Sequence, residues 1–431
     1  MKQYHTIVIG GGISGLESAL GLANQGYKVL IVEKEASIGG NMIALSKVFP
    51  TLDCASCITT PKMSEAAHHD NIDILTCSEA IQTSKQGETF TVTVLRKPRY
   101  VDEDRCIGCK QCEQGCPVLV PHEFERELGA RKAICIPFTT AIPQIAVLNP
   151  NDCIQCGHCY DVCPTDPKAI NYDQEPVEET YICDSVILAT GFNITEVNKK
   201  KQYSDGTARN VITSFQLERI LAPSGPYGSV MRPGDGKAPD NIAFVLCAGS
   251  RDQSIDMPYC SRVCCMYSIK QAMLLSGALP LADITLYYMD IRAFGKNYEQ
   301  FYRNAEAMGI QFVKAKIARI SEQDNGDLLM SLEDQEQSGS AREASHDMVV
   351  LASGIVPCID PSTIAPVQID DYGFVRQARQ KDDPTLTHTD GLFVAGVASG
   401  PKDIVDTIAE AGSAAMKASN YILKNGEQSD E

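Results

Sequence analysis

Residues 4–33, YHTIVIGGGISGLESALGLANQGYKVLIVE, contain one complete βαβ unit. The short, β-branched run 4–9 predicts a buried parallel strand. Residues 17–26 continue at helical spacing and end on Gly26, a residue typical of helix C-termini. Residues 28–33 predict the next strand. This stretch therefore predicts a domain of the α/β class with a parallel sheet.

The turn between strand and helix carries the triplet Gly10, Gly12 and Gly15, and the second strand ends on Glu33. Gly10 allows a tight turn, Gly12 lets the backbone approach a pyrophosphate, and Gly15 lets the helix pack closely on the strand. The helix N-terminus would stabilise the phosphates, and Glu33 would accept hydrogen bonds from ribose hydroxyls. These features together indicate a bound dinucleotide rather than a merely structural glycine turn.

The 431 residues carry a formal net charge of −17 and include 18 cysteines. The negative charge excludes nucleic acid as a partner, because its phosphates would be repelled. No apolar signal core precedes the first strand, and no apolar run is long enough to span a bilayer, so we expect a cytoplasmic chain. In that reducing compartment, so many cysteines indicate metal ligation rather than disulfides.

Eight of the cysteines form two copies of one run, Cys-x-x-Cys-x-x-Cys-x-x-x-Cys-Pro. In this pattern three closely spaced thiolates wrap one cubane, and the fourth reaches the other cluster. We therefore assign one 4Fe–4S cluster to Cys106, Cys109, Cys112 and Cys163, and a second to Cys153, Cys156, Cys159 and Cys116. Zinc is the competing metal, but zinc sites rarely use a three-residue gap followed by proline.

A third group, Cys247, Cys260, Cys264 and Cys265, supplies the four thiolates that a cubane usually takes. Adjacent cysteines are awkward partners for a mutual disulfide, yet both can face one cluster. The alternative is a patch of small buried core residues. With this group the cysteines predict three clusters.

Three further segments resemble the signatures of the two-dinucleotide-binding-domain flavoproteins, the thioredoxin-reductase-like group. They are EKEASIGGNM at 33–42, LATG at 188–191 and GLFVAG at 391–396. The resemblance implies FAD, held by Lys34, Gly40, Asn41, Thr190, Gly191, Gly396 and the residue after it. That residue is Val397, where the group usually has an acidic side chain, so the ribityl chain must find another partner.

The second α/β unit would carry another glycine triplet in a pyridine-nucleotide reductase. VLCAGSRDQS at 245–254 replaces it, and Cys247 stands where the pyrophosphate turn would begin. Direct use of NAD(P)H is therefore not expected.

Several segments along the chain together resemble the A-type subunits of heterodisulfide reductases. They are PTLDCASCITTPKM at 50–63, the two-cluster cysteine run, LCAGSRD at 246–252, YCSRVCCMYSIKQA at 259–272 and GPKDIVDTIAEA at 400–411. The resemblance implies a cluster at the third cysteine group close to FAD. It also implies a flavin that splits electron pairs between ferredoxin and a disulfide-reducing partner (flavin-based electron bifurcation). The same resemblance implies an anaerobic, oligomeric complex with B-type and C-type or other redox subunits.

The chain departs from the long form of that family at both ends. It starts directly at the flavin domain and ends without a C-terminal ferredoxin domain, which removes candidate exits for electrons. We therefore expect a short form whose terminal electron acceptor is open.

The remaining cysteines are interpreted more simply. Cys54 and Cys57 form a Cys-x-x-Cys that could share a fourth cluster with a partner protein, act as a dithiol, or have no redox role. Isolated cysteines are more often core residues than ligands, which applies to Cys77, Cys135, Cys183 and Cys358.

Lys270 is the candidate catalytic residue. It follows Cys265 by five residues on an expected helix, so its side chain should project near the same face as the cluster. By the family resemblance this helix borders the isoalloxazine ring. An ammonium there would stabilise anionic reduced flavin and could donate to N5. The alternative is a solvated lysine on an exposed helix face.

These observations predict an α/β, thioredoxin-reductase-like flavoprotein with an inserted α+β two-cluster ferredoxin domain. The insert, 98–176, would separate paired strands at 88–96 and 180–188. The expected domain boundaries are 1–97, 177–215 and 346–431 for the FAD-binding domain and 216–345 for a degenerate NAD-like domain.

Two other functions compete with a flavin-centred electron distributor. One is an NAD(P)H-fed flavoprotein like the small subunit of glutamate synthase, whose clusters lie N-terminal and whose second glycine triplet is intact. The other is a non-catalytic relay that only connects other subunits.

Overall fold

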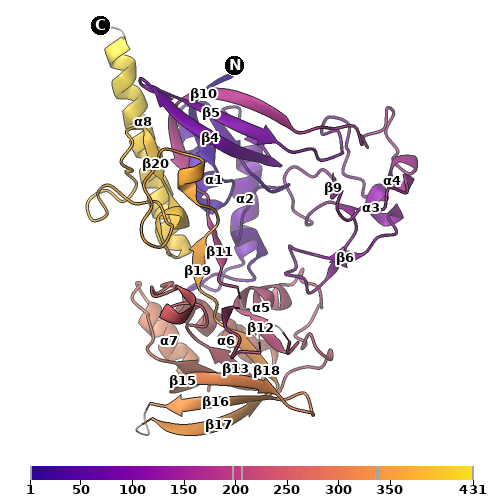
Figure 1. Cartoon of the computed structure of the whole chain (residues 1–431), viewed down its shortest axis with the longest axis vertical. Helices are drawn as coiled ribbons and strands as arrows, with labels where there is room; N and C mark the ends of the chain where they lie inside the picture. The colour runs from indigo at the N-terminus through magenta and orange to yellow at the C-terminus, as the bar shows by residue number, and fades with distance from the viewer. Residues whose placement is uncertain (1, 197–198, 205–206, 336–338, 430–431) are drawn as a thin grey trace. The chain divides into compact units, whose positions relative to one another are not determined.

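The computed structural model describes residues 2–196, 199–204, 207–335 and 339–429. The chain forms two compact units, each built from separate segments (Figure 1). The first unit comprises Met1–Ile43, Cys57–Phe192 and Pro357–Glu431, and the second comprises Ala44–Ser56 and Asn193–Val356.

The first unit is built on a mixed seven-stranded sheet in the order β3-β2-β1-β10-β5-β4, with β20 paired to β10. Strands β3, β2, β1, β10 and β20 run parallel, and β5 and β4 are antiparallel neighbours. The strands are β1 (Lys2–Ile9), β2 (Val29–Val32), β3 (Ile72–Leu75), β4 (Ser78–Gln86), β5 (Thr89–Arg96), β10 (Val177–Leu188) and β20 (Leu392–Val394).

The helices α1 (Ile13–Ala23), α2 (Ala55–Ala67) and α8 (Ile404–Ser429) accompany this sheet. Alanines of α8 at 411, 414, 415 and 418 are at most 1% exposed and share a core with α1. Gly21 allows the close approach of the two helices, because a Cβ added to it would lie 3.2 Å from the Cβ of Ala415. The N-terminal βαβ prediction is confirmed.

The cysteine-rich insert leaves β5 and returns through β10, whose paired residues Arg96 and Val177 bring its two ends together. Most of the insert is loop around a small core that includes Cys112, Cys116, Cys159 and Cys163. Its short elements are α3 (Gln111–Gly115), α4 (His158–Asp161), β6 (Val120–Pro121), β7 (Ala130–Arg131), β8 (Ile134–Cys135) and β9 (Val147–Leu148).

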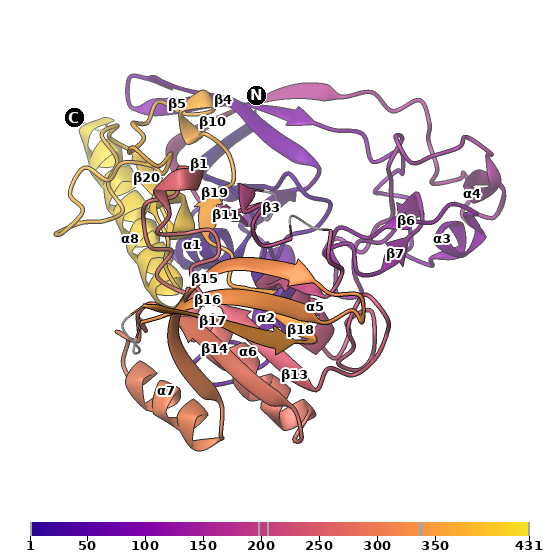
Figure 2. The same cartoon turned by 60° about the horizontal axis from the view of Figure 1, so that its bottom comes forward.

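The second unit has its own seven-stranded sheet, ordered β12-β18-β13-β14-β15-β16-β17. Figure 2 shows β15, β16 and β17 as a three-stranded antiparallel layer. The strands are β12 (Val211–Thr213), β13 (Asn241–Val245), β14 (Asp283–Tyr288), β15 (Gln311–Glu322), β16 (Leu328–Asp334), β17 (Ser340–His346) and β18 (Met348–Leu351). The helices are α5 (Ser214–Leu221), α6 (Cys264–Ala278) and α7 (Tyr298–Ala307). The pair β11 (Phe192–Ile194) and β19 (Ile355–Pro357) forms where the chain passes from one unit to the other.

Two expected boundaries differ from this division. Residues 193–215, expected in the FAD-binding domain, contribute β12 to the second sheet, and residues 346–356 contribute β18. The physical reason is burial: all four residues of β18 are buried between β12 and β13, in parallel register with both. Residues 44–56 also group with the second unit.

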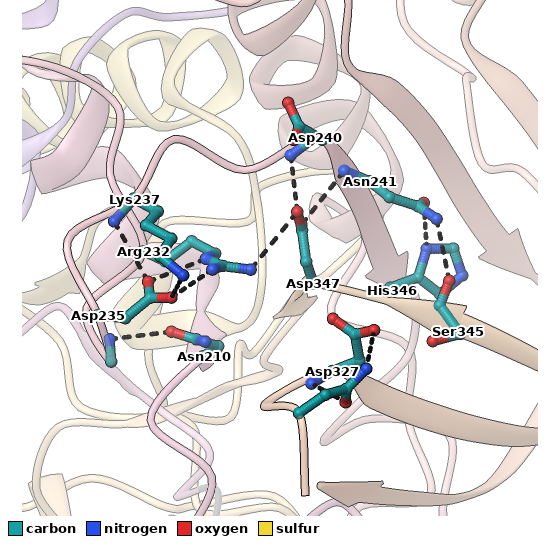
Figure 3. Close-up of polar contacts among 12 residues, drawn as sticks. Asn210, Arg232, Asp235, Lys237, Asp240, Asn241, Asp327, Ser345, His346 and Asp347 are labelled. Atoms are coloured by element: carbon teal, nitrogen blue, oxygen red, sulfur yellow. Dashed lines mark hydrogen bonds and ion pairs between the residues drawn. The ribbon is translucent and has the colours of Figure 1, made fainter. Parts of the chain in front are cut away.

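A polar network anchors the loop before β13 to the N-terminal ends of the strands (Figure 3). The carboxylate of Asp347 accepts from the backbone N–H groups of Asp240 and Asn241 at 2.7 and 3.2 Å. Arg232 joins it through an ion pair of 3.5 Å and also pairs with Asp235. The loop is therefore fixed by side chains rather than by a helix or strand.

In the described part of the chain, no helix is both long and apolar enough to cross a membrane.

Candidate flavin and iron–sulfur sites

The glycine-rich segments of the first unit converge at the carboxyl ends of β1, β10 and β20. The N–H of Ala189 donates to Ile9 and that of Ala395 to Leu188, so the three strands end at one level. A Cβ on Gly10, whose φ is +113°, would lie 2.2 Å from the carbonyl oxygen of Ala189. The carboxyl ends of parallel strands are where α/β sheets bind ligands.

The N-terminus of α1 has the form that a pyrophosphate requires. Its N-cap residue, Gly12, provides no capping side chain, so N–H groups of the first turn stay available. The nearest atom to a Cβ built on Gly12 is the Cα of Gly40, at 3.7 Å. A Cβ on Gly15 would instead lie 1.9 Å from the oxygen of Gly10. A Cβ on Gly12 would therefore make only an ordinary van der Waals contact, whereas Gly15 is needed for packing.

Glu33 lies buried at the end of β2, as a ribose-binding carboxylate should. One oxygen accepts from the N–H of Gly11 at 2.7 Å and the other from the N–H of Glu35 at 2.9 Å. Burial raises the pKa of Glu33, although these hydrogen bonds oppose the rise. Lys34, also expected at the cofactor, donates to the thiol of Cys358 at 3.1 Å.

Glu410 occupies the place beside Gly396 that the sequence left without an acidic partner. Its carboxylate accepts from the N–H of Gly396 at 2.9 Å and pairs with Lys402, and all three lie in the first unit. Val397 is 7% exposed, and a Cβ on Gly396 would collide with Ser14 of α1 at 2.8 Å. Helix α8 therefore places a carboxylate against the turn at Gly396, fourteen residues beyond that glycine in the sequence.

The insert is joined to the loop that follows β2. The hydroxyl of Ser37 donates to the carbonyl of Ile142 at 3.1 Å and accepts from the N–H of Ile142 at 2.8 Å. Arg126 donates to Asn41 at 3.0 Å, and Asn41 in turn donates to the carbonyl of Phe192 at 2.9 Å. Asn41 thus connects the insert to the chain beyond Gly191.

Glycines at this site leave room for a ligand. Apart from the adjacent residues in the chain, no atom of the described residues lies within 4 Å of a Cβ built on Gly191 or Gly400. Together with the uncapped α1 and the space at Gly12, these residues fit a dinucleotide, and Thr190 lies on the same turn as Gly191.

The insert contains two cavities, and each is lined by one of the crossed cysteine sets. The first is bordered by Cys106, Cys109, Cys112 and Cys163, together with Pro164. The second is bordered by Cys116, Cys153, Cys156 and Cys159. The fourth cysteine of each run therefore lies with the first three of the other, which is the arrangement that two cubanes require.

The two cysteine loops follow one backbone path. In the first, Gly108 and Lys110 on either side of Cys109 have φ of +66° and +62°. In the second, Gln155 and Gly157 on either side of Cys156 have φ of +58° and +75°. Each loop therefore contains two residues in the left-handed conformation. One of them is a glycine, which adopts it without strain, and the other is not.

Burial shapes the chemistry of these thiols. It raises the pKa of Cys112 to about 12 and also raises the pKa of Cys159. For Cys163 burial is outweighed by hydrogen bonds from Thr165 and from nearby backbone N–H groups, which lower the pKa. Buried thiols of this kind become thiolates when a metal compensates the charge. Among the described residues, no three His, Cys, Asp or Glu side chains converge on a position for a single metal ion.

The third cysteine group gathers around the start of α6. Cys264 and Cys265 are each 5% exposed in its first turn, while Cys247 has a φ of +58° in the turn after β13. Burial raises the pKa of both helical thiols, and the nearby thiol groups of Cys247 and Cys260 raise them further. The thiols of Cys264 and Cys265 therefore lie within electrostatic range of those of Cys247 and Cys260.

The turn after β13 is closed by the chain itself. Thr195 donates to the carbonyl of Gly249 at 2.8 Å, and a Cβ on Gly249 would lie 3.1 Å from the nitrogen of Gly354. In addition, α6 begins only at Cys264 rather than directly after the turn. The turn after β13 therefore differs from the turn at Gly12, where α1 begins directly after the glycine and no side chain caps the helix.

Lys270 is buried rather than solvated, so the alternative of an exposed helix face is wrong. Its side chain is 2% exposed, forms an ion pair with Glu218 of α5 and donates to the carbonyl of Lys47 at 2.8 Å. Glu218 also accepts from the N–H and hydroxyl of Ser46 at 2.9 and 2.7 Å. Burial lowers the pKa of Lys270, whereas the charge of Glu218 opposes that effect.

The remaining cysteines are placed as follows. Cys77, Cys135 and Cys183 are buried, in keeping with core positions, whereas Cys358 contacts Lys34. Cys54 directly precedes α2 and Cys57 lies exposed in its first turn.

Several residues whose side chains hold the candidate sites in place could not be found from the sequence: Glu410, Lys402, Glu218, Ser37 and Arg126. Each acts through a partner that is distant in sequence or on another element, so spacing carries no signal for it. The sequence does show Lys402 and Glu410 within one short segment, 400–411, but not that they pair.

Two family models match parts of the chain. A NAD(P)-binding Rossmann-like domain matches residues 8–53, and a 4Fe-4S dicluster domain matches residues 105–167. Among solved structures, thioredoxin reductase of T. acidophilum has a TM-score of 0.54 at 15% identity and covers 98% of this chain and 100% of its own. The thioredoxin-reductase-like fold is confirmed.

Curated relatives extend over nearly all of the chain. The A-type subunit of the H(2):CoB-CoM heterodisulfide,ferredoxin reductase of Methanothermobacter marburgensis is 43% identical over 97% of this chain. The A-type iron-sulfur subunit of the CoB--CoM heterodisulfide reductase of Methanocaldococcus jannaschii is 43% identical over 96%. This chain spans 64% and 63% of the length of those relatives. Over the part that it spans, the chain is homologous to the A-type subunits of heterodisulfide reductases.

Proposed function

We propose that the chain is an oxidoreductase subunit that passes electrons between FAD, three 4Fe–4S clusters and the other proteins of a heterodisulfide-reductase-like complex. The observation that carries the proposal is the pair of cavities lined by crossed cysteine sets, in a unit that also presents a flavoprotein-type strand end. The relatives' names, which join heterodisulfide and ferredoxin reduction, support it.

When bound, FAD would exchange two electrons with one partner and single electrons with the clusters. The protein's contribution is to hold and insulate these groups. The first turn of α1 would hold the pyrophosphate and Glu33 the adenosine ribose, while Gly40, Thr190 and Gly191 line the same strand ends. The ribityl chain would meet the segment from Gly396 that Glu410 fixes.

The insert would act as an electron port toward a partner. The middle cysteines, Cys109 and Cys156, are exposed, and the isoleucines at 107 and 154 are 69% and 64% exposed. The ligands at the other positions are buried or half-buried. Each cluster would thus have one side toward solvent and one toward the protein core.

The crossed ligation is tested by paired serine variants. Cys106→Ser/Cys163→Ser should lose the iron of one cluster, because both residues line one cavity. Cys106→Ser/Cys116→Ser should damage both clusters, because its two residues line different cavities. Cys135→Ser, a buried cysteine of the insert outside both sets, is the control. Equal iron loss in the two double variants would contradict crossing.

The cofactor content of the whole protein tests the proposed FAD and the proposed number of clusters. One FAD and the iron of three 4Fe–4S clusters are expected after anaerobic purification. Iron for only two clusters would show that the third cysteine group holds none. Zinc in place of iron would overturn the proposal. Cys109→Ser should keep FAD and stop electron transfer from the flavin through the insert to its partner. Bleaching of the flavin by NADPH alone within seconds would instead favour a pyridine-nucleotide-fed enzyme.

Lys270 is proposed to set the flavin potential through its charge. Two of its three N–H bonds have partners among the described residues, Glu218 and the Lys47 carbonyl. Removing the lysine alone would leave Glu218 charged and buried, which destabilises proteins by about 3–5 kcal/mol. The informative variant is therefore Lys270→Met/Glu218→Gln, which removes both charges. Flavin midpoint potentials that differ from those of wild type, with intact cofactors, would support this role. Potentials that overlap with wild type would mean that the ion pair has only a structural role.

We place the complex in a reducing, anaerobic environment, with B-type and C-type redox subunits and ferredoxin as partners. The twelve cysteines of the three groups, proposed as cluster ligands rather than as disulfides, support such an environment. Cys54 and Cys57 are offered for a shared fourth cluster. Co-purification of the native complex under anaerobic conditions identifies the partners.

A further inference from the structure

The loop that follows β14 presents a positively charged surface with an exposed aromatic ring. Phe294 is 59% exposed, the Arg292 side chain is 49% exposed, and Lys296 is exposed as well. All three belong to the second unit. A single exposed ring is common on protein surfaces, so the charged side chains around it carry the argument.

Two further arginines from neighbouring segments complete this surface. The guanidinium of Arg262 lies over the ring of Phe294, 5.1 Å from its centroid. Arg251 and Arg292 both pair with Asp290, at 2.7 and 3.1 Å. The single carboxylate of Asp290 therefore pairs with two arginines, so it cannot neutralise both charges. We call Arg251, Arg262, Arg292, Phe294 and Lys296 the basic loop surface.

The basic loop surface borders the third cysteine group. The N–H of Arg262 donates to the sulfur of Cys260 at 3.3 Å, and the thiol of Cys265 lies 3.7 Å from the carbonyl oxygen of Asp290. Cys260 is itself half-buried. A redox centre held by these sulfurs would lie directly behind the surface.

This local charge is opposite to that of the whole chain. With 38 Lys and Arg against 55 Asp and Glu, the protein as a whole repels acidic proteins. A confined basic patch in such a field directs an acidic partner to one place and raises its association rate. The patch is small, as is typical of short-lived redox encounters.

We propose that the basic loop surface docks an acidic one-electron carrier protein of the iron–sulfur type, which exchanges electrons with a cluster at the third cysteine group. In the transfer a reduced carrier loses one electron and the cluster gains it, with no bond or proton exchanged. The proposal rests on the proposed function for that cluster. It adds a docking site distinct from the insert.

Binding can be measured independently of turnover. Isothermal titration of the holoprotein with an oxidised, acidic two-[4Fe–4S] ferredoxin should give an affinity that falls as salt rises. Arg292→Glu/Lys296→Glu should weaken that affinity at low salt by about tenfold or more and flatten its salt dependence. Phe294→Ala, which leaves the charges in place, should weaken binding without flattening the salt dependence.

The matched control is Lys314→Glu/Lys316→Glu, which changes the charge equally at exposed positions of β15 in the same unit. It should leave ferredoxin binding near wild type. Stopped-flow reduction by the same ferredoxin should slow only in the surface variants. Transfer to a basic cytochrome c should not slow in any of them.

Three results would overturn the proposal: no ferredoxin binding by wild type, equal weakening by the control pair, or unchanged binding in both surface variants. A chain that binds ferredoxin at this surface but lacks iron at the third cysteine group would retain the docking site and refute the proposed function. Iron content measured on each variant separates these cases.

Discussion

Gly12 and Gly15 have opposite surroundings, although they belong to one motif. Gly12 has φ of −76° and its missing Cβ meets nothing closer than 3.7 Å. We expect Gly12→Ala to change the stability of the apoprotein by less than about 0.5 kcal/mol. It should weaken FAD about tenfold or more, because the methyl group would enter the space for the pyrophosphate. FAD titration and denaturant unfolding of the apoprotein measure the two effects.

Gly15→Ala is the matched variant, and it should behave in the reverse way. Its Cβ would lie 1.9 Å from the Gly10 oxygen, so we expect a loss of more than about 3 kcal/mol in stability before any effect on FAD. Equal stability of the two variants would show that the close packing at Gly15 can relax.

His346 should make the second unit sensitive to acid. Asn241 uses its amide N–H₂ on the Ser345 carbonyl at 3.0 Å, so its oxygen faces the His346 ring at 2.7 Å (Figure 3). The ring must then donate from Nδ1, and Nε2 accepts from the Tyr287 hydroxyl at 3.0 Å. Burial of this neutral ring lowers the pKa of His346 to about 4.

Because the folded-state pKa lies below the unfolded value of about 6.5, the unfolded chain takes up the proton first. The contribution of His346 to stability is complete above pH 6.5 and is lost as the pH falls toward 4. From pH 6.5 to 5 the expected loss is about 2 kcal/mol at most. Unfolding of the holoprotein across that range should be less pH-dependent in His346→Gln. Parallel pH profiles would show that other groups cause the dependence.

At the scale of elements, the cysteine loops depend on left-handed residues that are not both glycine. Gln155 adopts a φ of +58°, which a β-branched side chain resists. Gln155→Val should therefore lower the occupancy of the second cluster, whereas Gln155→Gly should retain it. Iron analysis and the spectrum of each reduced cluster measure the difference, and Ile154→Val controls for the neighbouring side chain. Full occupancy in Gln155→Val would mean that the cluster imposes the loop conformation.

The same elements show what the sequence could and could not predict. The crossed cysteine sets were predictable because ligand spacing is local and the run is duplicated. The β18 strand was not, because MVVL is as apolar as any buried strand and carries no sign of its sheet. Glu218 lies 52 residues before Lys270, so helical spacing suggested that Lys270 lies near the cluster but not which residue would pair with it.

At the scale of the whole molecule, ligand binding should stabilise the two units differently. The FAD site is formed by residues of the first unit, so FAD added to the apoprotein should slow amide exchange in β1, α1 and β20. The strands β15, β16 and β17 of the second unit should show little change. Hydrogen-exchange mass spectrometry tests this, and equal protection of both regions would mean that the units fold as one cooperative body.

The position of the insert has a consequence for how the chain is made. Strand β10 pairs with both β1 and β5, so the first sheet cannot close until residues 177–188 have been synthesised. Residues 98–176 leave the ribosome before that moment. The cysteine loops are therefore complete while the flavin-binding sheet is still open. Cluster delivery to the nascent insert can precede FAD, and iron–sulfur assembly need not wait for the flavoprotein around it to finish folding.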